Sequence, residues 1–276
     1  MKFKAYGLNQ YTAQILSVLL LFICSVSTAM ATGERWAELR KAYFGDAAIV
    51  TGDSVISLQA PKRAHDAAVV PVSVSVEDDS RTIRELYLFV DQNPLPLAGI
   101  FRFTEEAGYW KALETRIRIN EYTDIRAIAV LANGELHMTE RFVKASGGCS
   151  APALADLDAA MANAGKMKLM LNEVYSEPDL PVSEAVIKIS HPNNSGMQFD
   201  QVSRNYIPAF YVNTIRASLD GVEVMSIETN FSMSENPVVR LGFGQDVRAT
   251  TLEVVAIDSK GNEYSRQANA TAFSDQ

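Results

Sequence analysis

Apolar and polar residues alternate with a period of two along two long blocks of the chain. In the first block, valines stand at every second position from Val70 to Val76, separated by proline and serine. Successive side chains of a β-strand point to opposite faces, so this alternation indicates a strand with one buried face. Further runs in this block either alternate between apolar and polar residues in the same way or are apolar throughout. We therefore expect strands at residues 70–76, 86–90, 116–119, 125–131 and 135–143.

A second block with the same period begins near Lys166. It predicts strands at residues 167–171, 186–190, 215–219, 222–227, 238–243, 252–257 and 263–267. Asn133-Gly134 and Asp220-Gly221 each stand between two consecutive expected strands. Both dipeptides favour tight hairpin turns, because their residues tolerate a positive φ.

The spacing of the strands predicts the fold class. Each block has roughly 105–115 residues, the usual size of an immunoglobulin-like sandwich. We expect an all-β chain with two immunoglobulin-like β-sandwich domains, at residues 32–145 and 166–272. No strong helical run separates the strands within either block, which argues against a parallel α/β fold. A short N-terminal helix precedes them, because Trp36, Leu39 and Tyr43 recur at helical spacing and Gly45 suits a helix end.

Residues 1–31 have the features of a cleavable secretory signal peptide. Lys2 and Lys4 give a basic start, an apolar run covers residues 15–26, and Ala29 and Ala31 form a small-x-small cleavage site. The run of about 12 residues is shorter than the roughly 20 that a membrane-spanning helix needs. We therefore expect cleavage after Ala31 and export to the periplasm as a soluble protein. An uncleaved anchor is the alternative.

Composition narrows the possible functions. The 276 residues include 25 basic and 33 acidic side chains, for a formal charge of −8, which argues against nucleic acid as the main partner. Signal-peptide cleavage makes the mature chain still more acidic. With two cysteines and three widely separated histidines (His65, His137 and His191), a multi-ligand zinc or iron–sulfur site is nearly excluded. We expect no metal and no cofactor.

A segment without a strand pattern separates the two blocks at residues 146–165. It begins with Ser146-Gly147-Gly148-Cys149-Ser150-Ala151-Pro152 and continues as an alanine-rich stretch to Gly165. The glycines make the backbone permissive, and Pro152 has no N–H to donate to a strand ladder. The alanine-rich part is compatible with a short helix that ends at Gly165 or with a flexible tether. We expect a thiol-bearing arm and a linker here.

Cys149 is the only thiol left once the signal peptide, with Cys24, is removed. In an oxidising compartment such a cysteine is buried, paired with another molecule or used chemically. Its neighbours are small and polar, which favours an accessible, reactive thiol over a buried one. A disulfide with a second molecule is a further alternative. The direction of its pKa shift stays open, because a following helix favours the thiolate and nearby aspartates oppose it.

The order of these features resembles a known family. The matching residues of the first block are Trp36, Phe44-Gly45-Asp46, Ala60-Pro61, Val70-Pro71-Val72, Asp91-Gln92-Asn93-Pro94, Arg116-Ile117-Arg118 and Gly147-Gly148-Cys149. Those of the second are His191-Pro192, Gly196, Ile207-Pro208, Asn236-Pro237, Asp258 and Gly261. The first block resembles SoxY, the sulfur carrier of the bacterial thiosulfate-oxidising system, and the second resembles its partner SoxZ. Together they cover nearly all of residues 34–268, as in the fused SoxYZ-like carriers associated with quinoprotein dehydrogenases.

The resemblance implies a role for each part of the arm. Cys149 would hold a sulfur-containing or other thiol-reactive group covalently, and Gly147 and Gly148 would form the hinge. Partner oxidoreductases would act on this cargo, either Sox-type enzymes or a quinoprotein dehydrogenase and its cytochrome. The chain would be a carrier and no enzyme itself, and its SoxY-like and SoxZ-like domains would pair within the molecule. His191 would support a loop or an interface.

The arm departs from the family pattern on its C-terminal side. In the family two glycines follow the cysteine and end the chain, whereas here Ser150-Ala151-Pro152 follow and the chain continues. Four steps from Ala145 to Cys149 reach at most about 14 Å. This length disfavours deep insertion into a partner and is compatible with a protruding loop. Two rival functions are a non-covalent accessory module that docks on a periplasmic dehydrogenase or cytochrome, and a cysteine-dependent enzyme with a histidine near Cys149.

Overall fold

The structure is a computed structural model, and it describes residues 33–78, 80, 82–105, 110–152, 157–176, 180–243 and 249–270. The expected signal peptide at residues 1–31 lies outside the described residues. The chain divides into two compact units, residues 1–46 and residues 47–276. Among the described residues, no helix is long and apolar enough to cross a membrane.

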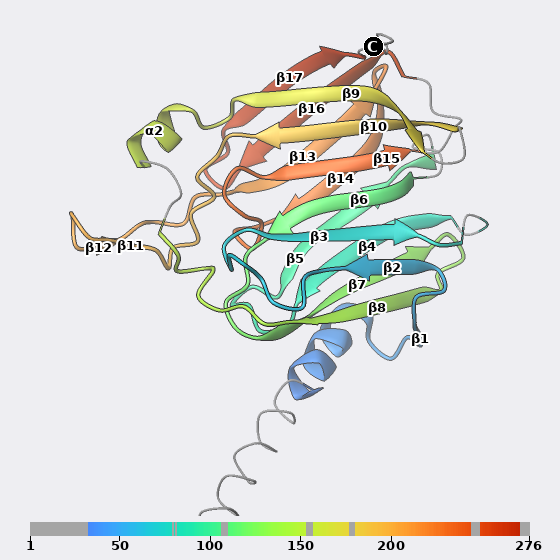
Figure 1. Cartoon of the computed structure of the whole chain (residues 1–276), viewed down its shortest axis with the longest axis horizontal. Coiled ribbons are helices and arrows are strands. Elements are labelled where there is room, and N and C mark those ends of the chain that lie inside the picture. The colour runs from blue at the N-terminus through green and yellow to red at the C-terminus, as the bar shows by residue number, and fades with distance from the viewer. Residues whose placement is uncertain are drawn as a thin grey trace, which may run out of the picture. The chain divides into compact units, whose positions relative to one another are not determined.

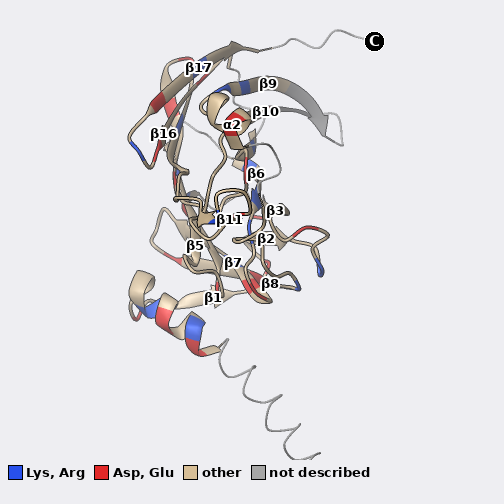
Figure 2. Ribbon diagram, turned by 90° about the vertical axis from the view of Figure 1, so that its left-hand side faces the viewer, with Lys and Arg blue, Asp and Glu red and all other residues tan. Residues whose placement is uncertain are grey.

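The described part of the first unit is a helix over residues 33–44, which confirms the expected short N-terminal helix. Gly45 follows it with a φ of 60°, a conformation that suits a helix end. Acidic and basic residues alternate along this helix (Figure 2), and the side chains of Arg35 and Glu38 form an ion pair at 3.5 Å. The helix therefore has a charged surface over part of its circumference.

The second unit is a two-layer β-sandwich (Figure 1). Its nine-stranded sheet has the order β1 (Ile49–Thr51), β8 (Leu136–Val143), β7 (Thr123–Leu131), β4 (Ile83–Val90), β5 (Leu97–Phe103), β14 (Val222–Thr229), β13 (Val212–Leu219), β16 (Thr251–Asp258) and β17 (Glu263–Asn269). Its six-stranded sheet has the order β2 (Ile56–Gln59), β3 (Val70–Val76), β6 (Trp110–Ile117), β15 (Val238–Phe243), β10 (Leu180–Ile189) and β9 (Met167–Ser176). The all-β fold expected from the alternation is confirmed.

Both sheets run without interruption through the two sandwich halves. β5 of the first half pairs antiparallel with β14 of the second, and β6 pairs antiparallel with β15. Side chains reinforce this seam: Thr229 Oγ1 donates a hydrogen bond to Ala98 O at 2.8 Å, and Arg102 forms an ion pair with Glu228 at 2.6 Å. The seam satisfies strand edges that separate sandwiches would leave open.

One apolar core fills the space between the sheets and continues through both halves. On β3 the alternate residues Val70, Val72 and Val74 are buried, and they belong to the same cluster as Ile215 and Ala217 of β13. Burying an aliphatic side chain of this size contributes about 1.5–3 kcal/mol. A core shared in this way stabilises the two halves together.

Both expected hairpins are present, and the linker contains a short helix. The turns at Asn133-Gly134 and Asp220-Gly221 join β7 to β8 and β13 to β14, and both Asp220 and Gly221 have positive φ values of 49° and 82°. Helix α2 (Leu157–Ala162) lies in the alanine-rich stretch, and Gly165 follows it with a φ of 85°. The sequence left a helix and a flexible tether open for this stretch, and the structure has a helix that ends at Ala162, before Gly165.

Candidate functional site

The Gly-Gly-Cys segment follows β8 and packs against the loop that leaves β6. The N–H of Gly147 donates to Asn120 O at 2.8 Å, and the N–H of Gly148 donates to Ile119 O at 2.9 Å. Gly148 lies so close to the neighbouring backbone that a Cβ there would stand 2.0 Å from Ala67 O. Gly147 has a φ of 80°, which favours glycine. Both glycines hold the segment against the sandwich in this conformation.

Cys149 is completely buried, with 0% of its surface exposed, and it forms no disulfide within the described residues. The expectation of an accessible thiol on a protruding loop is therefore wrong for this conformation. The residues next to Cys149 in the sequence are small, but the residues that bury it come from parts of the chain far away in sequence. Ser195 of the second half donates its hydroxyl to Cys149 O and thereby ties the segment across the seam.

Burial controls the ionisation of Cys149. It raises the pKa of the thiol to about 11, and the positive charge of Arg118 partly opposes this rise. The structure thus gives the direction of the shift that the sequence left open. Since the thiolate is the nucleophilic form, the thiol is protonated and poorly reactive near neutral pH in this conformation.

Arg118 lies beneath the segment at the seam and is only 1% exposed. Its Nη2 donates to Asn193 O at 3.1 Å, and its Nη1 approaches Gly148 O at 3.4 Å. Its Nε has no hydrogen-bond partner among the described atoms. Burial lowers the pKa of the guanidinium, and the ionisable groups of Cys149, Glu235 and Asp66 act against that shift. One side chain therefore links the cysteine segment to the second half.

The loop over residues 190–198, after β10, contributes buried polar side chains to the same region. His191 Nδ1 accepts a hydrogen bond from the N–H of Asn193 at 3.1 Å, and its ring lies 4.3 Å from that of Phe210. Asn193 in turn donates its side-chain amide to Met233 O at 3.1 Å. Burial lowers the pKa of His191 to about 4, against the charge of Asp258, which raises it. His191 is thus a neutral side chain that organises its own loop.

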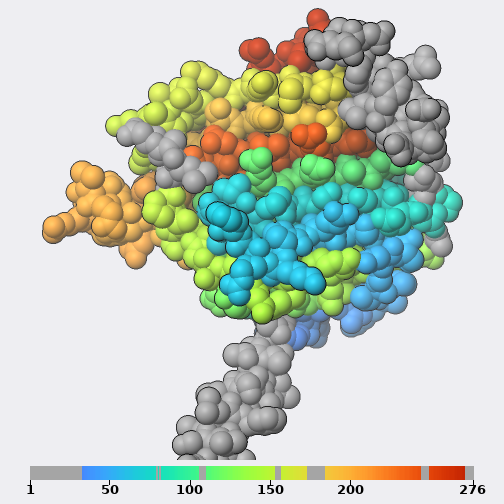
Figure 3. Space-filling view, viewed as in Figure 1, coloured from blue at the N-terminus to red at the C-terminus, as the bar shows by residue number. Residues whose placement is uncertain are grey.

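A small hairpin continues from this loop and projects from the sandwich (Figures 1 and 3). It is formed by β11 (Phe199–Asp200) and β12 (Asn205–Tyr206), and the N–H of Ile207 donates to Gln198 O at its base. The rings of Phe199 and Tyr206 meet edge to face at 5.5 Å, yet 42% and 67% of these residues are exposed. The hairpin therefore presents apolar surface next to the loop that contacts Cys149.

Family models match most of the chain in two consecutive segments. The model for sulfur oxidation protein SoxY matches residues 40–149, and the model for sulphur oxidation protein SoxZ matches residues 178–269. The chain belongs to the SoxY and SoxZ families, fused in one polypeptide. The SoxY match ends at Cys149, so the candidate thiol stands at the last matched position of its domain.

Solved structures give weaker similarities, and the curated proteins give no significant match. The sulfur carrier protein SoxY from Chlorobium limicola f thiosulfatophilum is 21% identical over 43% of this chain and 98% of its own, with a TM-score of 0.36. A superoxide reductase (neelaredoxin) from Ignicoccus hospitalis is 20% identical over 35% of this chain and 94% of its own, with a TM-score of 0.30. In the described part of the present chain, no group of three or more His, Cys, Asp or Glu side chains could hold a metal ion.

The SoxY and SoxZ domains pair within the chain, and the candidate site lies where they meet. The structure brings the expected Gly147, Gly148 and Cys149 to this seam. It adds Arg118 of the SoxY domain, which the sequence quoted only as part of the family resemblance, and Ser195 of the SoxZ domain, which the sequence did not single out. Arg118 alternates with isoleucine and so resembled a solvent-facing strand residue, and its burial depends on contacts with distant parts of the chain. Ser195 gave no recognisable signal.

Proposed function

We propose that the protein is a periplasmic sulfur carrier that holds its cargo covalently on Cys149. The observation that carries this proposal is the placement of the single described thiol at the end of the SoxY match, on a Gly-Gly segment held at the seam with the SoxZ domain. Membership of both families supports a role in sulfur oxidation. Partner enzymes perform the chemistry, and this chain presents the cargo.

Carrying cargo to a partner requires the segment to leave its resting position. In the described structure, its hydrogen bonds to the rest of the sandwich include those of Gly147 and Gly148 to the loop after β6, the contact of Arg118 with Gly148 O, and the bond from Ser195 to Cys149 O. Each contributes about 0.5–1.5 kcal/mol net, so release is within reach of the binding energy of a partner. In the resting state the buried, protonated thiol is protected from side reactions.

The expected signal peptide supports a periplasmic location, where partner oxidoreductases of the Sox type also act. The resemblance to quinoprotein dehydrogenase-associated carriers supports a second kind of partner, a quinoprotein dehydrogenase and its cytochrome. A carrier role needs no catalytic base next to the thiol. Among the described residues, no histidine is hydrogen-bonded to Cys149, and His191 directs its Nδ1 to the backbone of Asn193.

The burial of Cys149 favours one rival function. In that account the chain is a non-covalent accessory module that docks on a periplasmic dehydrogenase or cytochrome, and Cys149 only fills space at the seam. Burial raises the pKa of the thiol to about 11, which is compatible with an unreactive, structural cysteine. The two functions predict different effects on thiosulfate oxidation when Cys149 is replaced by a residue without a sulfur atom.

The test replaces the chromosomal gene by Cys149→Ser, with Ser150→Ala as the matched control on the neighbouring, exposed residue. Oxygen consumption by whole cells is measured with thiosulfate and, separately, with a short alcohol. If the protein is a carrier, the thiosulfate-dependent rate falls at least about tenfold in Cys149→Ser and is unchanged in Ser150→Ala. Rates that survive in both variants contradict the carrier and support the docking module.

A further inference from the structure

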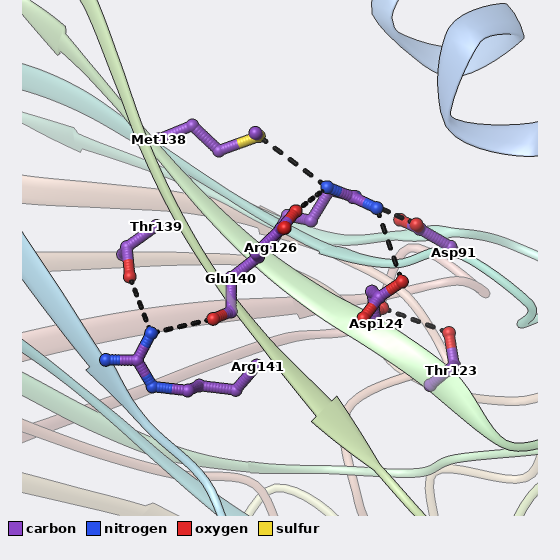
Figure 4. Close-up of polar contacts among 8 residues, drawn as sticks. All are labelled: Asp91, Thr123, Asp124, Arg126, Met138, Thr139, Glu140 and Arg141. Carbon is purple, nitrogen blue, oxygen red and sulfur yellow. Dashed lines mark hydrogen bonds and ion pairs between the residues drawn. The ribbon is translucent and has the colours of Figure 1, made fainter. Parts of the chain in front are cut away.

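Among the described residues of the sandwich, Arg118 and Arg126 are buried, and they differ in their electrostatic surroundings. Arg126, with 8% of its side chain exposed, stands among three carboxylates (Figure 4). Its Nε lies 2.8 Å from Asp91 Oδ2 and its Nη2 lies 3.4 Å from Asp124 Oδ2, while Nη1 contacts Glu140. Arg118 is buried more completely, yet no carboxylate forms an ion pair with it among the described residues.

An unpaired buried charge is costly, because the interior replaces water poorly as a solvent for ions. Two backbone carbonyls, at 3.1 Å and 3.4 Å, compensate Arg118 in part. The Nε donor has no partner in the described structure. This arrangement leaves both a positive charge and a hydrogen-bond donor available to an anion.

The available charge acts on Cys149. Gly148, whose carbonyl oxygen contacts Arg118, is the residue before the cysteine. The resting thiol is protonated and does not neutralise the guanidinium. A negatively charged group attached to the sulfur atom would supply the missing counter-charge, whereas a neutral group would not.

We propose that Arg118 is a specificity-determining residue of this site: it binds the charged end of a group carried on Cys149 and thereby favours anionic adducts over neutral disulfides. The inference rests on the proposed carrier function and names the residue that distinguishes one adduct from another. Arg118 then contacts the cargo directly, from within the seam between the two domains.

The proposal is tested with two reagents that load Cys149 with groups of different charge. The thiolate attacks an inner sulfur of tetrathionate, a new S–S bond forms at Cys149, and thiosulfate leaves with the electron pair of the broken central S–S bond. Methyl methanethiosulfonate reacts in the same way, with methanesulfinate as the leaving group. In both reactions the thiol proton goes to solvent and the reagent is the oxidant. The first adduct is anionic and the second is a neutral methyl disulfide.

The full mature chain is compared as wild type, Arg118→Gln, Arg118→Lys and Arg116→Gln. Arg116 is the matched control, because it is an exposed arginine two residues away on β6. The rate of adduct formation is obtained from intact mass at fixed times. Both reagents require the segment to open, so the free-energy cost of opening cancels in the ratio of the tetrathionate rate to the methanethiosulfonate rate. We expect this ratio to fall about tenfold in Arg118→Gln, as loss of one charge-assisted hydrogen bond implies. Arg118→Lys keeps most of it, and Arg116→Gln leaves it unchanged.

A second readout compares the melting temperatures of the two adducts. In the wild type the anionic adduct melts above the methyl disulfide, and in Arg118→Gln this difference disappears. An unchanged ratio and an unchanged difference in Arg118→Gln overturn the proposal, as does an equal loss in Arg116→Gln. If Arg118→Gln does not fold, equal melting of the two wild-type adducts overturns it. Failure of the carrier function itself is seen separately, as thiosulfate oxidation that survives Cys149→Ser.

Discussion

At the level of single residues, the cover over Cys149 depends on the close approach of Gly148 to the backbone of Ala67. A Cβ at position 148 would stand 2.0 Å from Ala67 O and 2.7 Å from Ile119 O. Neither oxygen belongs to a flexible side chain, so the segment itself has to move when any other residue replaces this glycine.

Gly148→Ala should therefore release the segment and expose the thiol. We expect labelling of Cys149 by 5,5′-dithiobis(2-nitrobenzoate) at pH 8 to accelerate at least about tenfold, with a lower melting temperature. Gly147→Ala is the matched control: its Cβ meets open space and adds backbone strain at a φ of 80°, about 1–2 kcal/mol. Its labelling rate should rise less. If Cys149 in Gly148→Ala is labelled at the wild-type rate, the contact between Gly148 and Ala67 does not protect the thiol.

The identity of the thiol and of its two glycines was predictable from sequence, but its burial was not. Small neighbours indicate accessibility only when nothing else packs on the segment. The groups that cover Cys149 come from the loop after β6 and from the loop at residues 190–198. These contacts link residues far apart in the chain, with 46 positions between Cys149 and Ser195 and a still longer separation between Gly148 and Ala67, and no local pattern encodes them.

At the level of elements, the loop at residues 190–198 is the part of the SoxZ domain that contacts the cysteine segment, and its stability depends on a neutral His191. The folded state keeps the pKa of His191 at about 4, whereas the ordinary value is 6.5. The unfolded chain therefore takes up a proton at a higher pH than the folded one. The stabilisation from this group is complete above pH 6.5 and is lost as the pH falls towards 4.

His191→Gln should remove this pH dependence. Urea denaturation at pH 7.0, 6.0, 5.0 and 4.5 should give a free energy of unfolding that falls less steeply in the variant. The difference in slope approaches about 1.4 kcal/mol per pH unit, the value for one proton, between the two pKa values. Asp91, whose pKa burial raises to about 6, acts in the opposite direction in both proteins and cancels. Parallel pH profiles would contradict a buried neutral imidazole.

Most long strands were predictable, because they either alternate strictly or, like β7, form a continuous apolar run. β3 and β16 alternate regularly and bury every second residue. β5 was not expected, because it has the sequence LAGIFRF, with apolar residues on both faces and a glycine inside. This is also the strand that joins the nine-stranded sheet across the seam. One of the strands that join the two domains was thus not recognised from the sequence.

At the level of the whole molecule, fusion turns the pairing of the SoxY and SoxZ domains into continuous sheets. The linker keeps the domains at high effective concentration, and β5–β14 and β6–β15 complete both sheets. The sequence indicated two sandwiches and a pairing between them, but it did not specify which strand edges meet, because register across a seam depends on three-dimensional neighbours.

Splitting the chain should test this pairing. Residues 32–152 and 157–276, produced as separate chains in one cell, should co-purify as a single species in size-exclusion chromatography. Either half produced alone exposes the edges of β5 and β6 or of β14 and β15, and should aggregate or be degraded. Two soluble, monomeric halves that do not associate would show that the seam contributes little to stability.

The central claim is that Cys149 holds sulfur cargo during turnover, and intact mass of the protein from the periplasm tests it most directly. Cells oxidising thiosulfate are lysed into acid to trap adducts, and the mature chain is weighed with and without reductant. We predict a reductant-labile mass increase of one or more sulfur atoms, with or without a sulfonate group, which maps to Cys149 and is absent from Cys149→Ser. An unmodified thiol under these conditions would contradict the carrier function.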